Sequence, residues 1–129
     1  MDNRKTFETG SFRDRPVGRG MYSHMPPCAL KRLAQRYEFG FLKYGDPEMY
    51  KLGYPITDTL DSLLRHAVAY MEGDNSEDHL AAIAWNAFCM MHTEENVPKC
   101  QDIAARKKLS KAKGDFDYLK RVLEEGVIK

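Results

Sequence analysis

Four polar side chains interrupt the most apolar stretch of the chain, between positions 77 and 92. Asp78, His79, Trp85 and Asn86 share one sector of the helix expected there, and His79 and Asn86 stand two helical turns apart. Burying such groups without partners would cost about 1–3 kcal/mol each. The sector therefore predicts either a polar network, with Asp78 as a helix cap and Asn86 between helices, or a buried ligand site.

Acidic residues on the two preceding helical segments could complete such a site. Asp58 and Asp61 are spaced i, i+3 on one segment, and Glu38 lies on the earlier one. Carboxylates in this arrangement on facing helices provide the hard oxygen ligands that Mg²⁺ prefers. An acidic row opposite an apolar stripe also fits a solvated helix face, so both interpretations stay open.

The sequence contains no phosphate-binding glycine loop, no nucleophile elbow and no Rossmann glycine pattern. Phosphate binding would therefore depend on cationic side chains and divalent ions. Arginine suits this role because its planar fork binds two oxygens at once. The candidates are Arg19, Lys43 and Arg65. The Asp-His order at positions 78–79 does not match the phosphohydrolases that carry a His-Asp dipeptide.

Three cysteines, Cys28, Cys89 and Cys100, include no C-x-x-C pair. Cys89 and His92 are one helical turn apart and could begin a zinc site with Cys100, but no fourth ligand is evident. Buried apolar thiols are the simpler interpretation. The odd number of thiols and the lack of an apolar targeting segment predict a cytoplasmic protein.

Length and charge limit the function classes. The 129 residues give room for one domain with a single core, and 20 basic against 19 acidic residues give no overall field that would attract nucleic acid. No apolar run is long enough to cross a bilayer, so no membrane partner is expected. A small helical interaction or nucleic-acid-binding module, using the basic segments at 13–19 and 106–113, stays as an alternative.

Helices must position these residues. The segment 1–26 is an arm rich in glycine and arginine with no helical or strand period. Apolar spacing, prolines, glycines and caps predict helices from Pro27 to Tyr44, from Thr57 as N-cap to about Glu72, and from Glu77 to about Glu94 with Ser76 as N-cap. A basic segment at 103–113 and an amphipathic one at 115–125 follow.

The expected fold class is therefore all-α, a bundle of four to five helices with an irregular N-terminal arm. Its expected parts are the arm at 1–26, a helical core at 27–97 that holds the site, and a C-terminal helical segment at 98–129 that packs on the core or on a partner subunit.

The order of several short motifs resembles the phage dATP/dGTP pyrophosphohydrolase family, within the MazG-like all-α nucleotide pyrophosphatases, and its MazZ branch in particular. The resemblance covers Phe7 to about His92. The motifs are Thr9-Gly10-Ser11, Gly18-Arg19-Gly20-Met21-Tyr22, Pro26-Pro27, Tyr37-Glu38-x-Gly40-x-x-Lys43-Tyr44-Gly45, Leu63-Leu64-Arg65-His66, Glu77-Asp78-His79-Leu80-Ala81 and Ala84-Trp85-Asn86.

The resemblance implies a MazG-like helical bundle that forms a homo-oligomer, a dimer or tetramer, with active sites near subunit contacts. It implies Mg²⁺ or Mn²⁺ held by carboxylates, and a water that attacks the α-phosphorus of a purine deoxynucleoside triphosphate and releases pyrophosphate. The implied substrate is dGTP, converted to dGMP for 2-aminoadenine nucleotides in phage genomes, with dATP as an alternative.

The resemblance also suggests roles for individual residues. MazG-like enzymes carry Glu-x-x-Glu on one helix and Glu-x-x-Asp on another. In this chain Gln35-x-x-Glu38 stands in place of the first motif. The second motif corresponds either to Asp58-x-x-Asp61 or to the four residues that start at His79, which include no acidic residue. We expect Glu38 and Asp61 to be catalytic. The expected metal ligands are Glu38, Asp58, Asp61 and Asp78; Arg19, Lys43 and Arg65 are expected on phosphates, and His79, Trp85 and Asn86 near the nucleoside.

Overall fold

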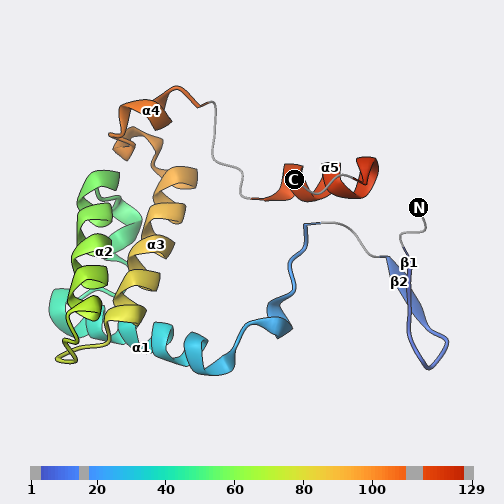
Figure 1. Ribbon diagram of the computed structural model, residues 1–129, viewed down its shortest axis with the longest axis horizontal. Helices are drawn as coiled ribbons and strands as arrows, with labels where there is room; N and C mark the ends of the chain where they lie inside the picture. Colours follow the sequence, from blue (N-terminus) through green and yellow to red (C-terminus); the bar gives the residue numbers. More distant parts are fainter. Residues whose placement is uncertain (1–3, 15–17, 110–114, 127–129) are drawn as a thin grey trace. The chain divides into compact units, whose positions relative to one another are not determined.

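Helices form almost all of the regular structure in the computed structural model, which describes residues 4–14, 18–109 and 115–126 (Figure 1). The all-α prediction is thus confirmed. The chain divides into two units, one comprising Met1–His24 with Lys113–Lys129 and the other Met25–Ala112. The second, called here the helical unit, carries the long helices. The part boundaries expected at 26 and 97 stay a prediction.

Proline and glycine fix the ends of α1 (Pro27–Tyr44), which has the predicted bounds. Pro27 occupies the first turn, where a missing N–H costs nothing. Gly45 follows the helix in the left-handed conformation, with φ 79°, and its N–H donates to the Phe41 carbonyl. A short 3₁₀ helix, η2 (Met49–Leu52), then leads to α2 (Ile56–Met71).

The start of α2 differs from the prediction that Thr57 is its N-cap. The helix begins at Ile56 with Pro55 as its N-cap, two residues before the predicted cap. The N–H and hydroxyl of Thr57 both donate to the Asp102 carboxylate, at 2.9 and 2.5 Å. Asp102 is 45 residues away in sequence and lies after η3 (Pro98–Cys100). The cap is therefore a tertiary contact, which local sequence cannot reveal.

At the start of α3 (His79–Asn96) the N-cap is Asp78, as the polar-network interpretation of that residue predicted, and not Ser76. One Asp78 oxygen accepts from the Ala81 N–H, and both oxygens accept from Arg32 of α1, at 2.6 and 2.8 Å. The Ser76 hydroxyl instead donates to Asp74. The Arg32 partner explains the choice, since a cap that also forms a charged double hydrogen bond is favoured over a neutral one.

Helices α2 and α3 lie side by side and antiparallel, and α1 crosses near the end of α2 and the start of α3 (Figure 1). Because α3 contacts α1, α2, η2 and η3, it is the central helix that its apolar composition predicted. The buried residues are mostly small, which lets the helices approach closely. They are Gly40, Ile56, Thr59, His79, Ala81, Ala82, Asn86, Cys89 and Thr93.

Edge-to-face aromatic contacts join η2 and α1 to α3. The rings of Tyr37, Tyr50 and Trp85 contact one another at centroid distances of 5.8 to 6.5 Å, and Tyr50 also contacts His92. Such contacts contribute about 0.5–1.5 kcal/mol each beyond buried area. They hold Trp85 against α1.

A short antiparallel hairpin, β1 (Arg4–Thr6) and β2 (Phe12–Asp14), corrects the expectation of an arm without strands. Its turn closes through the Phe7 N–H to the Ser11 carbonyl, with Gly10 at φ 90°. All residues of both strands are exposed. The sequence therefore lacks the alternation of apolar and polar residues that normally predicts a half-buried strand.

Short helices complete the described chain: η1 (Tyr22–His24), α4 (Ala104–Lys107) and α5 (Phe116–Glu125). Helix α4 lies in the predicted basic segment, whose positions 110–113 fall outside the described residues. Helix α5 lies in the predicted amphipathic one. Over the ranges that the structure describes, every helix is too short or too polar to cross a bilayer.

We expect Asp78→Ala to lower the free energy of unfolding by about 1 kcal/mol or more at pH 7, because it removes the cap of α3. Asp78→Asn should lower it less, since the amide oxygen still caps. Urea unfolding followed by circular dichroism measures both, with Glu95→Gln, an exposed carboxylate on the same helix, as the control.

The pH dependence of the free energy of unfolding tests the contact between Arg32 and Asp78. The Arg32 hydrogen bond lowers the pKa of Asp78 from 3.8 to about 2. The contribution of this carboxylate to stability is therefore complete above about pH 4 and is lost as the pH falls toward 2. The stability gap between wild type and Asp78→Asn should close over that range; a gap that is unchanged at pH 2 would contradict the assignment.

Candidate functional site

A hollow between α1, α2 and α3 collects polar, cationic and aromatic side chains. Its volume is about 90 Å³. Pockets that enclose whole small molecules start at roughly 300 Å³, so this one fits only part of a nucleotide. The lining residues are Arg36, Phe39, Gly40, Lys43 and Tyr44 of α1, Ser62 and His66 of α2, and Trp85 and Asn86 of α3.

The helices position this lining through their own periodicity. Arg36, Gly40 and Lys43 follow one face of α1, and Gly40 is buried there, so its lack of a side chain keeps the wall open. The Arg36 guanidinium lies over the Phe39 ring, 4.3 Å from the ring centre. The Asn86 amide donates to the Ala82 carbonyl one turn earlier, at 2.9 Å. Within the described residues, the buried Trp85 Nε1–H has no hydrogen-bond partner.

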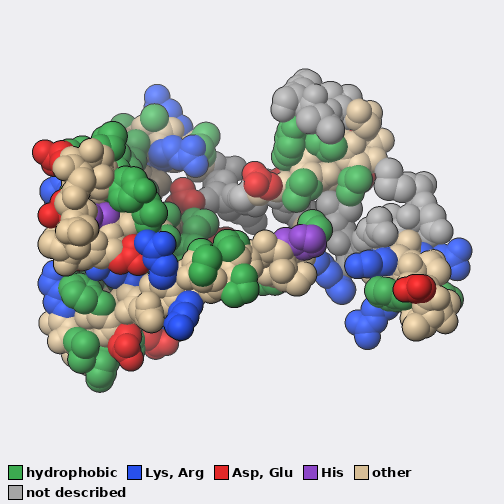
Figure 2. Space-filling model, turned by 60° about the horizontal axis from the view of Figure 1, so that its bottom comes forward, with side chains coloured by type: hydrophobic (Ala, Val, Ile, Leu, Met, Phe, Trp, Pro, Cys, Tyr) green, Lys and Arg blue, Asp and Glu red, His purple; other side chains and the backbone are tan. Residues whose placement is uncertain are grey.

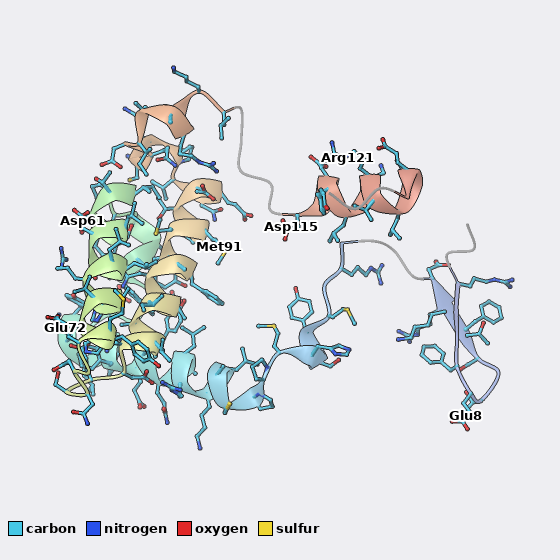
Figure 3. All side chains as sticks on the ribbon, viewed as in Figure 1. Glu8, Asp61, Glu72, Met91, Asp115 and Arg121 are labelled. Atoms are coloured by element: carbon cyan, nitrogen blue, oxygen red, sulfur yellow. The ribbon has the colours of Figure 1, made fainter. Side chains whose placement is uncertain are left out.

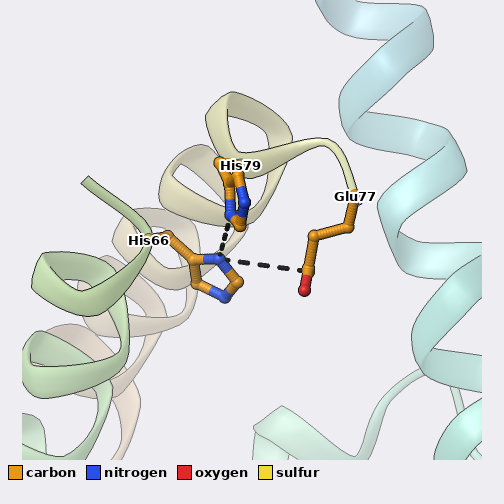
Figure 4. A group of neighbouring side chains, drawn as sticks. All are labelled: His66, Glu77 and His79. Atoms are coloured by element: carbon orange, nitrogen blue, oxygen red, sulfur yellow. Dashed lines mark hydrogen bonds and ion pairs between the residues drawn. The ribbon is translucent and has the colours of Figure 1, made fainter. Parts of the chain in front are cut away.

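Two histidines meet beside this hollow, where α2 and α3 face each other (Figure 4). The Nδ1 atoms of His66 and His79 are 2.8 Å apart, and Glu77 places a carboxylate oxygen 3.9 Å from the His66 Nδ1. The same oxygen accepts a hydrogen bond from Arg36 at 2.9 Å. His66 and Arg36 thus belong both to this cluster and to the lining of the hollow.

A chain of hydrogen bonds fixes the proton positions in the pair. Hydrogen bonds from His79 and Ser76 hold the pKa of Asp74 below its usual range, so this carboxylate only accepts. A neutral His79 then donates Nε2–H to this carboxylate and keeps its lone pair on Nδ1. Burial lowers the pKa of His66, with Glu77 opposing the shift. A neutral His66 donates Nδ1–H to His79 and keeps its Nε2 unprotonated.

The structure brings some of the predicted residues together. Lys43, Trp85 and Asn86 line the hollow, and the buried His79 reaches it through His66. Arg19 is exposed and belongs to the other unit.

The predicted carboxylates lie elsewhere in the helical unit. Asp61 lines a shallow depression on the outer face of α2 with Arg65 and Glu72, on the side away from α3 (Figure 3). Asp58 is exposed on the same helix and Glu38 is exposed on α1. Asp78 caps α3 and pairs with Arg32. Their assignment as metal ligands stays a prediction.

Only one group of three metal-binding side chains occurs in the described ranges, 4–14, 18–109 and 115–126: His66, Glu77 and His79. Neither the four predicted carboxylates nor the alternative set of Cys89, His92 and Cys100 forms such a group there. Cys89 is instead a buried thiol whose pKa is raised to about 12 by burial.

Sequence reasoning overlooked the pairing of His66 with His79. They stand seven residues before and six residues after Gly73, the glycine in the turn between α2 and α3. His66 lies five residues before the last residue of α2, whereas His79 is the first residue of α3, so spacing about the turn does not predict the pair. The available signal was that a buried histidine needs a hydrogen-bond partner. Arg36, Asp74 and Glu77 had no comparable signal, because their contacts depend on where α1 crosses.

A family model described as dATP/dGTP diphosphohydrolase, N-terminal, matches residues 10–103. The match includes all of α1, α2 and α3 and hence every residue of the hollow and the histidine cluster. No curated protein and no solved structure matches the chain.

We expect iodoacetamide at pH 8 to modify Cys89 about 100-fold or more slowly than Cys28, because burial lowers both its thiolate fraction and its accessibility. Mass spectrometry of the peptides measures each rate. In urea the two rates should become similar, which is the control. Equal rates in the folded protein would show that Cys89 is accessible and would reopen the zinc interpretation.

Proposed function

The chain belongs to the dATP/dGTP diphosphohydrolase family, and we propose that it hydrolyses dGTP to dGMP and pyrophosphate. The observation that carries the proposal is the hollow between α1, α2 and α3, which combines two cations with aromatic walls. A nucleoside triphosphate offers the matching chemistry, an anionic chain attached to a flat base.

Arg36 and Lys43 are suited to the phosphates. The Lys43 ammonium is a compact charge, whereas the Arg36 guanidinium can bind two oxygens at once. Arg36 is already held by Glu77 and Phe39, so it is oriented before a ligand arrives. Such preorganisation avoids part of the entropy cost of binding.

Trp85 and its surroundings are suited to the nucleoside. The ring lines the hollow and is fixed against Tyr37 and Tyr50, which suits it to stack on a bound base. Asn86 and Ser62 add polar groups on the same wall.

A divalent ion, Mg²⁺ or Mn²⁺, is part of the proposed reaction, since it neutralises phosphate charge and lowers the pKa of an attacking water. Among the predicted ligands, Asp78 fits this role poorly because Arg32 and the Ala81 N–H already occupy its oxygens. Glu38, Asp58 and Asp61 are exposed carboxylates that remain open to an ion. In phages with 2-aminoadenine, dGMP would feed synthesis of the modified nucleotide.

A homo-oligomer, a dimer or tetramer, is also proposed. Large hydrophobic side chains are exposed on all three long helices, among charged ones (Figure 2). A second copy that covers such faces would also enlarge the walls of a hollow too small for a whole nucleotide. Examples of these exposed side chains are Leu30, Phe41 and Leu42 of α1, Leu64, Val68 and Met71 of α2, and Leu80, Phe88 and Met91 of α3.

Incubation of the purified chain with each deoxynucleoside triphosphate plus Mg²⁺ or Mn²⁺ tests the activity. We expect dGTP to give dGMP and pyrophosphate in equal amounts, identified by anion-exchange chromatography. Lys43→Ala should lower kcat/KM by about 10-fold or more, because it removes a charge-assisted contact to phosphate. The matched control is Lys51→Ala, a lysine that pairs with Glu48 outside the hollow.

The same assay tests the predicted carboxylates, since Glu38→Gln and Asp61→Asn should abolish pyrophosphate release if these residues act in catalysis. Release of inorganic phosphate or tripolyphosphate in place of pyrophosphate would contradict the proposed bond. Absence of turnover with every nucleotide and both ions would reject the proposed function.

Oligomer formation should make stability depend on concentration. We expect light scattering to give at least twice the chain mass, and the thermal midpoint to rise as the protein concentration is raised 100-fold, since association stabilises the folded state by mass action. A monomer mass with a constant midpoint would contradict the oligomer.

A further inference from the structure

Three potential metal-ligand atoms converge where α2 faces the start of α3. One potential ligand atom from each of His66, Glu77 and His79 lies within 4.8 Å of the other two (Figure 4). His79 is buried, His66 is partly buried and the Glu77 side chain is 37% exposed. The cluster is therefore shielded from solvent on the His79 side and accessible to solvent on the Glu77 side. An ion could therefore enter from the Glu77 side.

The orientation of His79 is that of a metal ligand. Its Nε2–H donates to the Asp74 carboxylate, which in turn accepts from Ser76. Histidines that bind metals almost always donate their second ring N–H to such an acceptor, which fixes the tautomer and strengthens the remaining lone pair. That lone pair, on Nδ1, points to the side where His66 lies.

The spacing of the two imidazoles is close to that of a metal site. Two nitrogen ligands at about 2.0–2.1 Å from one tetrahedral ion lie roughly 3.3 Å apart. The two Nδ1 atoms are 2.8 Å apart, so the rings would separate slightly on binding. Without an ion, one proton must occupy this gap. Binding would replace that proton, with the Glu77 oxygen moving closer than its present 3.9 Å while Arg36 continues to neutralise it.

We propose that His66, Glu77 and His79 bind a divalent transition-metal ion, represented by Zn²⁺ or Co²⁺, in preference to Mg²⁺. Two imidazoles and one carboxylate suit ions of borderline softness, whereas Mg²⁺ takes mainly oxygen ligands. The ion would lie beside the hollow, since His66 and Arg36 belong to both, and its remaining positions would be open to water or an anion. This site is distinct from the predicted Glu38, Asp58 and Asp61 set and does not depend on the proposed hydrolysis.

Co²⁺ titration of the full chain without nucleotide tests the proposal, because Co²⁺ bound to imidazoles absorbs visible light. We expect one Co²⁺ per chain, displaced by Zn²⁺ but not by an excess of Mg²⁺. His66→Ala and Glu77→Gln should weaken binding by about 10-fold or more, and Asp74→Asn by about 10- to 100-fold through His79. The matched control, His92→Ala on the same helix, should bind like wild type.

Circular dichroism checks that each variant folds. If His66→Ala does not fold, the conservative variant Glu77→Gln still tests the proposal. The proposal is overturned if wild type shows no cobalt absorption, if Mg²⁺ displaces Co²⁺, if Glu77→Gln binds as tightly as wild type, or if His92→Ala is the variant that loses binding. Because the titration contains no nucleotide, a failure to bind Co²⁺ would not contradict the proposed hydrolysis. An absence of hydrolase activity would likewise not contradict the proposed metal site.

Discussion

The contact between α2 and α3 is the interaction on which the rest of the structure depends. Small side chains such as Ala81 and Ala82 let the helices approach closely, and the same closeness places two imidazoles against each other. A buried histidine needs partners for both ring nitrogens. His79 finds them on opposite sides, His66 across the helix interface and Asp74 in the connecting turn, so the polar pair also fixes the geometry of the turn.

Helix α1 is attached to this pair through charge. Arg32 and Arg36 are one turn apart on α1, and they bind Asp78 and Glu77, which are adjacent at the start of α3. Negative charge at a helix N-terminus is favourable in itself, so each arginine binds a carboxylate that already stabilises α3. The contact with Glu77 also orients Arg36 beside the hollow. Fold and site therefore share the same residues, and changes at one affect the other.

Local patterns in the sequence predicted much of this fold and part of the site. Pro27 and Gly45 mark α1 because their backbone preferences act without tertiary help. The buried His79 and Asn86 were predicted because polar residues in an apolar helix require partners. The Asp102 cap of α2, the pairing of Arg32 with Asp78 and the approach of Arg36 to Glu77 depend on distant segments. No local pattern contains them.

The ring contacts of Trp85 have a consequence for spectroscopy. It is the single tryptophan of the chain, it lines the hollow, and it is held between two tyrosines. Nearly all indole emission from the protein therefore originates from the wall of the candidate site, with Tyr37 and Tyr50 close enough to pass excitation to it. The protein carries a built-in fluorophore that reports on whatever occupies that hollow.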